Sequence, residues 1–410
     1  MTKNRSNYQG SICNTRSLLW AVSDVIMALL LAVSAVETFA QDAKDNGSKI
    51  VGPKLIEFDP PGTATRSSSA CAPFCGTFAY ANNDLGDIVG TYTDVHVVPH
   101  GFLRTAQGSF ISFDAPGAGL GFGLDEGTVA YSINNQGVIT GQFEDPNLVF
   151  HGFVRYADGT FATFDAPGAG TGAFQGTFGN SISQEGVISG NYTDANYVYH
   201  GFVRDQEGNI TTFDAPGAGM NANASPQGTY PCLETCTNSA GAITGFLYDA
   251  GYALHGFVRQ PDGEITTVDA PRAATGAFLG TVSGSINTEG TLAGYLVDSN
   301  NAYHGFVSTP NGDFVTFDVP LSSQTPGQGT VVYSINATGT TTGQYNDTDG
   351  ANIGFSRTAA GSFTTFSAPG AGSSPSQGTR PSANNAQGAV TGWWIDQNNL
   401  NHGFVWTPAP

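Results

Sequence analysis

The chain has 410 residues, of which 55 are Gly, 21 are Pro and only 11% are charged. Its hydrophobic content of 40% is enough to bury a core, which excludes an intrinsically disordered protein. The 33 acidic and 14 basic side chains give a formal charge of −19, which repels phosphate backbones and anionic lipids and argues against binding to nucleic acids or membrane surfaces.

The N-terminal segment is predicted to be an export signal. Basic residues precede an apolar run at 25–35, and Ala35 and Ala40 offer cleavage sites. A permanent transmembrane anchor, the alternative, needs about 20 apolar residues, whereas Asp24 and Glu37 bracket a shorter stretch. We therefore divide the chain into a signal peptide at 1–40, a short linker at 41–52 and a single repeat domain at 53–410. The mature protein is expected to be secreted or periplasmic, without a membrane span.

Four short phrases recur along the rest of the chain. His-Gly-Phe returns at spacings of 49 to 55 residues when Ile353-Gly-Phe is included. Its histidines are His100, His151, His200, His255, His304 and His402. The other phrases are Ser-Ile-Asn-x-x-Gly (132–137), Gly-x-Tyr-x-Asp (190–194) and Phe-Asp-Ala-Pro (113–116). Four short apolar runs in a unit of this length are typical of β-propeller blades.

Turn residues indicate the order of strands within a unit. Gly closes tight loops at 135–137 and 157–159, and Asp194 begins a third turn, so three connections are hairpins. The fourth connection, at 165–177 in one unit, is long and Gly-rich and is expected to lead to the next blade. The Ser-Ile-Asn strand is then innermost, and the Gly-x-Tyr, His-Gly-Phe and Phe-Asp-Ala-Pro strands follow outward.

Each end of the domain carries part of a unit. The domain opens with an isolated outer strand at about 54–60 and closes with a third strand at about 401–406. Seven strands of each type result. We therefore predict an all-β fold, a seven-bladed β-propeller of four-stranded antiparallel blades, closed by pairing these two strands so that no sheet edge stays open. An open β-solenoid is the alternative.

These phrases resemble those of the HAF family, secreted bacterial proteins with extracellular repeats named for a His-Ala-Phe tripeptide. The resemblance covers roughly residues 52–410 through the His-Gly-Phe, Phe-Asp-Ala-Pro-Gly and Asn-x-x-Gly phrases. Gly stands where the family name has Ala, and Ile353 replaces one His. The resemblance implies an exported repeat protein with a propeller fold, and it implies no established activity.

Four cysteines follow the signal as two C-x3-C pairs. In an oxidising compartment we expect disulfides between Cys71 and Cys75 and between Cys232 and Cys236. A zinc site built from both pairs, the alternative, would need them to lie together. The pairs belong to units that are far apart around a ring, so disulfides are favoured.

The repeated histidines are spaced for pairing with aspartates. Each has an Asp six residues earlier, at Asp94, Asp145, Asp194, Asp249, Asp298 and Asp396. Five have another Asp fourteen residues later, and where Ile353 replaces His, Ser367 replaces that Asp. Hairpin folding places positions fourteen apart nearly opposite each other. We predict the structural pairs His100–Asp114, His151–Asp165, His200–Asp214, His255–Asp269, His304–Asp318 and, through closure, His402–Asp59.

The long connections and the turns between second and third strands share one face of a propeller, which we call the loop face. Sequence differences between units concentrate there, and variable loops on a rigid frame often carry recognition. The candidate binding residues are Phe122, Asp125, Glu126, Phe174, Tyr230, Phe278 and Arg380. Aromatic rings there could stack on sugars or anchor a partner protein. Neutral drift and aromatic plugs between blades are the alternatives.

The sequence carries no strong catalytic or cofactor motif. Asp125 and Glu126 are adjacent, whereas glycosidase carboxylates face each other across a bond. Nucleophile-elbow, zinc-protease and phosphate-loop motifs are absent, and 347–350 lacks most ligands of a calcium loop. We therefore expect no cofactor, no metal site and no catalytic residue.

Three hypotheses about function remain. The first is a secreted, monomeric, non-catalytic scaffold that binds an extracellular glycan or protein through the loop face. The second is a carbohydrate-active hydrolase or lyase whose acid and base come from different blades, with Asp125 and Glu126 as first candidates. The third is a structural envelope protein without a ligand.

Overall fold

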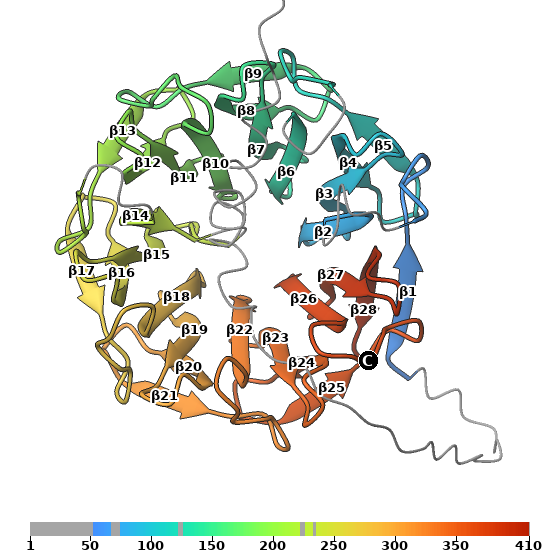
Figure 1. Cartoon of the computed structure of the whole chain (residues 1–410), viewed down its shortest axis with the longest axis vertical. Helices are drawn as coiled ribbons and strands as arrows, with labels where there is room; N and C mark the ends of the chain where they lie inside the picture. The colour runs from blue at the N-terminus through green and yellow to red at the C-terminus, as the bar shows by residue number, and fades with distance from the viewer. Residues whose placement is uncertain (1–51, 67–73, 122–125, 222–225, 233–234, 410) are drawn as a thin grey trace, which may run out of the picture.

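The computed structural model describes residues 52–66, 74–121, 126–221, 226–232 and 235–409. The predicted signal peptide, Cys71, Phe122 and Asp125 lie outside these ranges. The described residues form β-strands joined by turns and loops, and Figure 1 shows the strands arranged around a ring. The fold is a β-propeller.

The innermost strands face the centre of the ring (Figure 1). They are β2 (Thr77–Asn82), β6 (Gly127–Ile133), β10 (Gly176–Ile182), β14 (Gly228–Pro231), β18 (Gly280–Ile286), β22 (Thr330–Ile335) and β26 (Gly378–Asn384). The second strands are β3 (Ile88–Thr93), β7 (Ile139–Glu144), β11 (Ile188–Thr193), β15 (Ile243–Tyr248), β19 (Leu292–Val297), β23 (Thr341–Asn346) and β27 (Val390–Ile395).

The third strands contain the His-Gly-Phe phrase, with Ile353 in place of His in β24. They are β4 (Pro99–Arg104), β8 (Phe150–Arg155), β12 (Tyr199–Arg204), β16 (Leu254–Arg259), β20 (Tyr303–Ser308), β24 (Asn352–Arg357) and β28 (Asn401–Thr407). The outer strands are β5 (Phe110–Phe113), β9 (Phe161–Phe164), β13 (Ile210–Phe213), β17 (Ile265–Val268), β21 (Phe314–Phe317), β25 (Phe363–Phe366) and β1 (Lys54–Phe58).

Each blade is an antiparallel sheet in the predicted order. The sheet β2-β3-β4-β5 follows the chain from the centre outward, and the same order recurs around the ring. Adjacent blades touch through single parallel bridges, such as Phe150 with Gly176. Antiparallel pairing within every blade is inconsistent with the parallel coils of an open β-solenoid, so that alternative is wrong.

The two ends of the domain meet in one sheet. Strand β1 pairs antiparallel with β28, with Leu55 opposite Trp406 and Phe58 opposite Gly403. The blade of β26, β27 and β28 therefore takes its outer strand from the beginning of the domain. In Figure 1 the blue β1 lies along the red strands of this blade.

The core lies between neighbouring blades. The Phe of the His-Gly-Phe phrase, and of its Ile353-Gly-Phe counterpart, is fully buried each time, at Phe102, Phe153, Phe202, Phe257, Phe306, Phe355 and Phe404. One cluster joins Val89 of one blade to Ala130 and Phe153 of the next. Among the described residues, no helix has the length and apolar character required to span a membrane.

Candidate functional site

The loop face is held together by hydrogen bonds between its two kinds of segment. The Phe174 N–H, in the connection from β9 to β10, donates to the carbonyl of Leu148, in the turn from β7 to β8, at 2.6 Å. The Phe278 N–H donates in the same way to Tyr252 at 2.7 Å. The connections therefore have fixed positions on the turns.

Each turn of the loop face begins with an Asp that organises it. Oδ1 of Asp94 accepts hydrogen bonds from the N–H groups of His96 and Val98, at 2.8 and 2.9 Å. Oδ1 of Asp396 accepts two in the same way, from Asn398 and Leu400. An Asp side chain that bonds the backbone two residues on mimics a backbone turn. The Asp six residues before His thus shapes the turn.

The histidines lie beside the aspartates of the outer strands. Nδ1 of His100 is 2.8 Å from Oδ1 of Asp114, and Nδ1 of His402 is 2.7 Å from Oδ2 of Asp59. The other four distances from Nδ1 to the nearer carboxylate oxygen are 2.8 or 2.9 Å, for His151–Asp165, His200–Asp214, His255–Asp269 and His304–Asp318. Sequence reasoning therefore identified each partner, including Asp59, which is 343 positions from its histidine.

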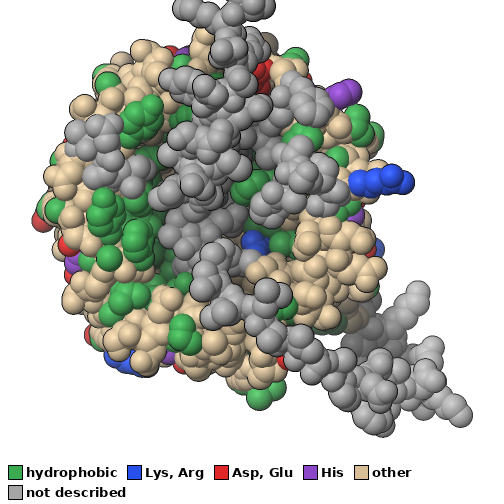
Figure 2. Space-filling model, viewed as in Figure 1, with side chains coloured by type: hydrophobic (Ala, Val, Ile, Leu, Met, Phe, Trp, Pro, Cys, Tyr) green, Lys and Arg blue, Asp and Glu red, His purple; other side chains and the backbone are tan. Residues whose placement is uncertain are grey.

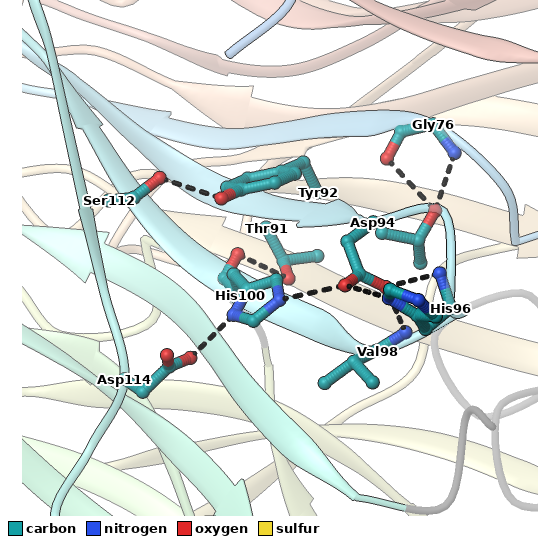
Figure 3. A network of polar contacts seen from close by, with 10 residues as sticks. Gly76, Thr91, Tyr92, Asp94, His96, Val98, His100, Ser112 and Asp114 are labelled. Atoms are coloured by element: carbon teal, nitrogen blue, oxygen red, sulfur yellow. Dashed lines mark hydrogen bonds and ion pairs between the residues drawn. The ribbon is translucent and has the colours of Figure 1, made fainter. Parts of the chain in front are cut away.

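Figure 3 shows this network in the blade of β2 to β5. Asp114 lies on one side of the His100 ring, and Oδ2 of Asp94 lies 3.7 Å from Nε2 on the other side. Oδ2 of Asp94 also lies 3.3 Å from Nδ1 of His96, whose side chain is exposed. The His100 ring packs on Tyr92, with 5.3 Å between the ring centroids.

The flanking groups shift the pKa values of these side chains. The hydrogen bond that Nδ1 of His100 donates to Asp114 is the largest influence on His100 and raises its pKa above 6.5, although burial opposes the shift. At His402 burial is the largest influence and lowers the pKa, but the hydrogen bond and charge of Asp59 outweigh it, so the pKa is raised. For Asp94 the opposing burial is outweighed by the N–H groups of Val98 and His96, and the pKa is lowered.

Two shallow pockets adjoin turn aspartates on the loop face. One, of about 300 Å³, is lined by Asp94, His96, Val98, His100 and Leu120. The other, of about 460 Å³, lies between the connection 370–374 and Trp394, Asp396 and Gln397. Asp94 and Asp396 are equivalent, because each lies six residues before its His. These pockets offer carboxylates together with apolar surface to a ligand.

The predicted binding residues have different surroundings. Phe278 is 47% exposed on the loop face, and Phe174 is half-buried there. Glu126 is half-buried, and its Oε2 accepts a hydrogen bond from the Gly121 N–H, as Oε1 of Gln175 does from Gly172. The Glu126 carboxylate is thus tied to its own loop.

Two of the predicted binding residues lie in strands and not in the variable loops where they were expected. Tyr230 belongs to the inner strand β14, is only 2% exposed, and donates its hydroxyl hydrogen bond to the carbonyl of Pro226 at 2.7 Å. Its ring stacks on Phe246 at 5.2 Å, so it fills the core. Arg380 belongs to the inner strand β26, and its Nη2 donates to the carbonyl of Ser376 at 3.3 Å. Neither residue is in a variable loop.

The disulfide predicted between Cys232 and Cys236 is confirmed. Cys236 is fully buried and its partner nearly so. Cys75 is also buried and packs against Val97 and Leu400, while its predicted partner Cys71 lies outside the described residues. Within the part of the chain that the structure describes, no three His, Cys, Asp or Glu side chains form a group that could hold a metal ion.

Sequence reasoning missed Tyr252. This residue follows Gly251 in the turn between β15 and β16, and its ring stacks against Phe278, with centroids 5.7 Å apart and planes at 28°. The equivalent turn residues in two other blades are Asn301 and Asn399. Another blade has Tyr197 at this position, so an aromatic residue in the turn is not a signal by itself, and the contact with Phe278 is visible only in the folded structure.

No protein-family model and no curated protein matches the chain. Among solved structures, it is similar to the BP39L lectin from Burkholderia pseudomallei, with 12% identity, a TM-score of 0.46, and coverage of 81% of this chain and 98% of the lectin. It is also similar to the Aleuria aurantia lectin, crystallised with α-methyl-L-fucoside, with 9% identity, a TM-score of 0.39, and coverage of 71% and 93%. A puromycin hydrolase matches with 12% identity, a TM-score of 0.46, and coverage of 84% and 56%. Because these scores are low, no ligand or activity follows from them.

Proposed function

We propose that the protein is an exported, non-catalytic scaffold that binds an extracellular glycan through its loop face. The observation that carries this proposal is that both described pockets adjoin turn aspartates at equivalent positions, Asp94 and Asp396. Ligand sites are typically concave and combine apolar surface with a few placed polar groups.

The chemistry of these pockets favours a glycan as the ligand. Carboxylates accept hydrogen bonds from hydroxyl groups, and each pocket also has an apolar wall, formed by Leu120 in one and Trp394 in the other. Repeated shallow sites suit a repetitive polymer, because several weak contacts on one rigid frame add up through effective concentration. Figure 2 shows few Lys or Arg side chains on the face it displays, in keeping with the 14 basic residues of the chain.

Binding to an array of extracellular oligosaccharides, followed by chromatography of the recovered glycans, tests this proposal. We expect binding with the glycans recovered intact. The control variant Gln107→Ala changes an exposed residue in the turn between β4 and β5, at the other ends of the strands, and should bind as the parent does. Shortened glycans would overturn the proposal in favour of a hydrolase or lyase, and the absence of binding to every glycan would overturn it as well.

We also infer that the domain is a seven-bladed propeller whose ring is closed by its two ends. The pairing of β1 with β28 supports closure. So does the hydrogen bond of Asn385 Nδ2 to the carbonyl of Asn83, at 3.0 Å. Membership of the HAF repeat family, export through a signal at 1–40 and a monomeric state belong to the same proposal, and the buried Cys232–Cys236 disulfide suits an oxidising compartment.

A further inference from the structure

In the turn between β15 and β16, Oδ2 of Asp249 lacks the side-chain donor that most other blades provide. In five other blades, the residue two positions after the turn Asp places a side-chain nitrogen 3.0 to 3.4 Å from Oδ2 of that Asp; these residues are His96, Asn147, Asn196, Asn300 and Asn398. Gly251 occupies this position after Asp249 and has no side chain to donate. Oδ1 of Asp249 accepts the N–H groups of Gly251 and Ala253. Among the described side chains, Nε2 of His255 lies 3.9 Å from Oδ2 of Asp249, which is longer than a hydrogen bond.

This open carboxylate is also exposed. The side chain of Asp249 is 36% exposed, compared with 16% to 23% for Asp94, Asp145, Asp194 and Asp298. Gly251 is exposed beside it. A hydroxyl group of a ligand could therefore reach Oδ2 of Asp249 from solvent and donate to it.

Beside this carboxylate lies an aromatic platform, formed by Tyr252 and Phe278. Their rings stack, and Phe278 is 47% exposed. Phe278 also makes an edge contact with the buried Tyr248, with 6.1 Å between the ring centroids. The N–H of Tyr252 donates to the backbone carbonyl of Asp249 at 3.0 Å, which keeps platform and carboxylate in one turn.

The backbone of the platform is strained. The φ angles are +66° at Tyr252 and +62° at Phe278, a region that bulky residues rarely adopt. At the equivalent turn position other blades have Asn301 and Asn399 but also the bulky Val97, Leu148 and Tyr197, and the next connection but one has Ser376 in place of Phe278. Positive φ is therefore a feature of the repeated turns and connections, and it fixes where the rings of Tyr252 and Phe278 lie.

We propose that this blade holds a subsite for a neutral pyranose. The C–H face of the sugar stacks on the exposed ring of Phe278, which Tyr252 supports from the other side, and a ring hydroxyl donates to Oδ2 of Asp249. The C–H groups carry partial positive charge and are attracted to the negative face of an aromatic ring. Asp249, the nearby Asp269 and the net charge of −19 repel uronic and sialic acids. This inference rests on the proposed function and adds the place and the sugar class.

Three substitutions test the subsite, each to a residue that another blade has at the same position. Gly251→Asn supplies a side-chain amide that donates a hydrogen bond to Oδ2 of Asp249, as Asn300 does to Asp298. Because Gly251 does not have a positive φ, Asn can adopt its backbone conformation. Phe278→Ser copies Ser376, and Tyr252→Asn copies Asn301. The control is Tyr156→Ser, which removes an aromatic ring that is 40% exposed in the turn between β8 and β9, away from the loop face. Thermal melting checks that each variant is folded.

The probes are neutral oligosaccharides and the same oligosaccharides carrying a uronic acid. We expect the parent to bind the neutral probes, each of the three substitutions to weaken this binding at least tenfold, and Tyr156→Ser to leave it unchanged. Unchanged binding by the folded Gly251→Asn and Phe278→Ser variants would overturn the subsite while leaving the proposed function intact. Equal binding of the uronate probes would overturn the sugar class. Failure of the parent to bind any glycan would overturn the proposed function itself.

Discussion

At the scale of single residues, the repeated histidines act as cross-strand links within blades. His100 lies between Asp114 of the outer strand and Asp94 of the turn, so one ring joins three segments of its blade. The side chain of His402 is 19% exposed and makes the same link with Asp59. Six blades repeat this arrangement, which fits a structural role better than a catalytic one, because a catalytic group needs to occur only once.

These pairs make stability depend on pH. Native His100, His151, His200 and His402 have raised pKa values, so the folded protein binds their protons more tightly than the unfolded chain does. Their stabilisation is complete below the unfolded pKa of about 6.5 and is lost as pH rises through the raised native values. The double variant His402→Ile with Asp59→Ser copies Ile353 and Ser367. We expect urea unfolding to show that the free energy of unfolding of the parent exceeds that of this variant, and that the difference shrinks from about pH 6 to about pH 8. A difference in the free energy of unfolding that does not change with pH would contradict an ion pair between His402 and Asp59.

At the scale of strands, an outer-strand Phe packs on the glycine of the His-Gly-Phe phrase, except at Gly256, which pairs with Val268. A Cβ added at Gly152 would lie 2.5 Å from the ring of Phe164, the Phe of the neighbouring strand. On its other side, the Phe164 ring meets the guanidinium of Arg204 from the next blade, 5.2 Å from the ring centroid. The outer strand is thus held by its own blade and the next one, and this packing requires Gly at the middle of the phrase.

Gly152→Ala should therefore weaken the fold. The added methyl group forces the Phe164 ring away from its position between Gly152 and Arg204, and overpacking of this kind costs about 1–3 kcal/mol. Chemical denaturation of the variant and the parent measures the difference. Gly251→Ala is the control, because the nearest atom to its added Cβ is 3.3 Å away and belongs to the side chain of Asp249. Equal losses in the two variants would show that Phe164 does not require this glycine.

At the scale of the whole molecule, asparagines join successive blades near the centre. In each case Nδ2 of one Asn donates to a backbone carbonyl of the next blade; the donors are Asn83, Asn134, Asn238, Asn287, Asn336 and Asn385. Asn385 donates across 302 positions to the carbonyl of Asn83. Near the rim, Arg104 lies over the ring of Phe58 in β1, 4.9 Å from its centroid. The first and last blades are therefore linked both near the centre of the ring and near its rim.

Deleting residues 402–410 tests closure, since it removes most of β28 and leaves β27 and β1 without their partner. We expect a large fall in melting temperature, with aggregation through the exposed edges. A second, non-disruptive measurement uses Ile56→Cys with Val405→Cys, two positions that are paired in the β1–β28 register. Oxidation should cross-link the two ends within one chain, which mass spectrometry of a proteolytic digest detects. A deletion variant that melts like the parent, or cysteines that stay unlinked, would refute closure.

The repeat itself carried enough information to predict strand order, turn positions, the Cys232–Cys236 disulfide and the histidine partners. These features depend on spacing within one hairpin or on a phrase that recurs, so a local pattern determines them. Even Asp59 could be identified as the partner of His402, because it completes a phrase missing at the other end of the chain. Tertiary packing instead determined the burial of Tyr230, the position of Arg380 in an inner strand and the contact of Tyr252 with Phe278. The burial of Tyr230 depends on Phe246 of its own blade and Tyr199 of the preceding one, and the exposure of Phe278 depends on a strained turn that holds Tyr252 beneath it. Such contacts join segments whose sequences vary from unit to unit, so only the folded ring brings them together.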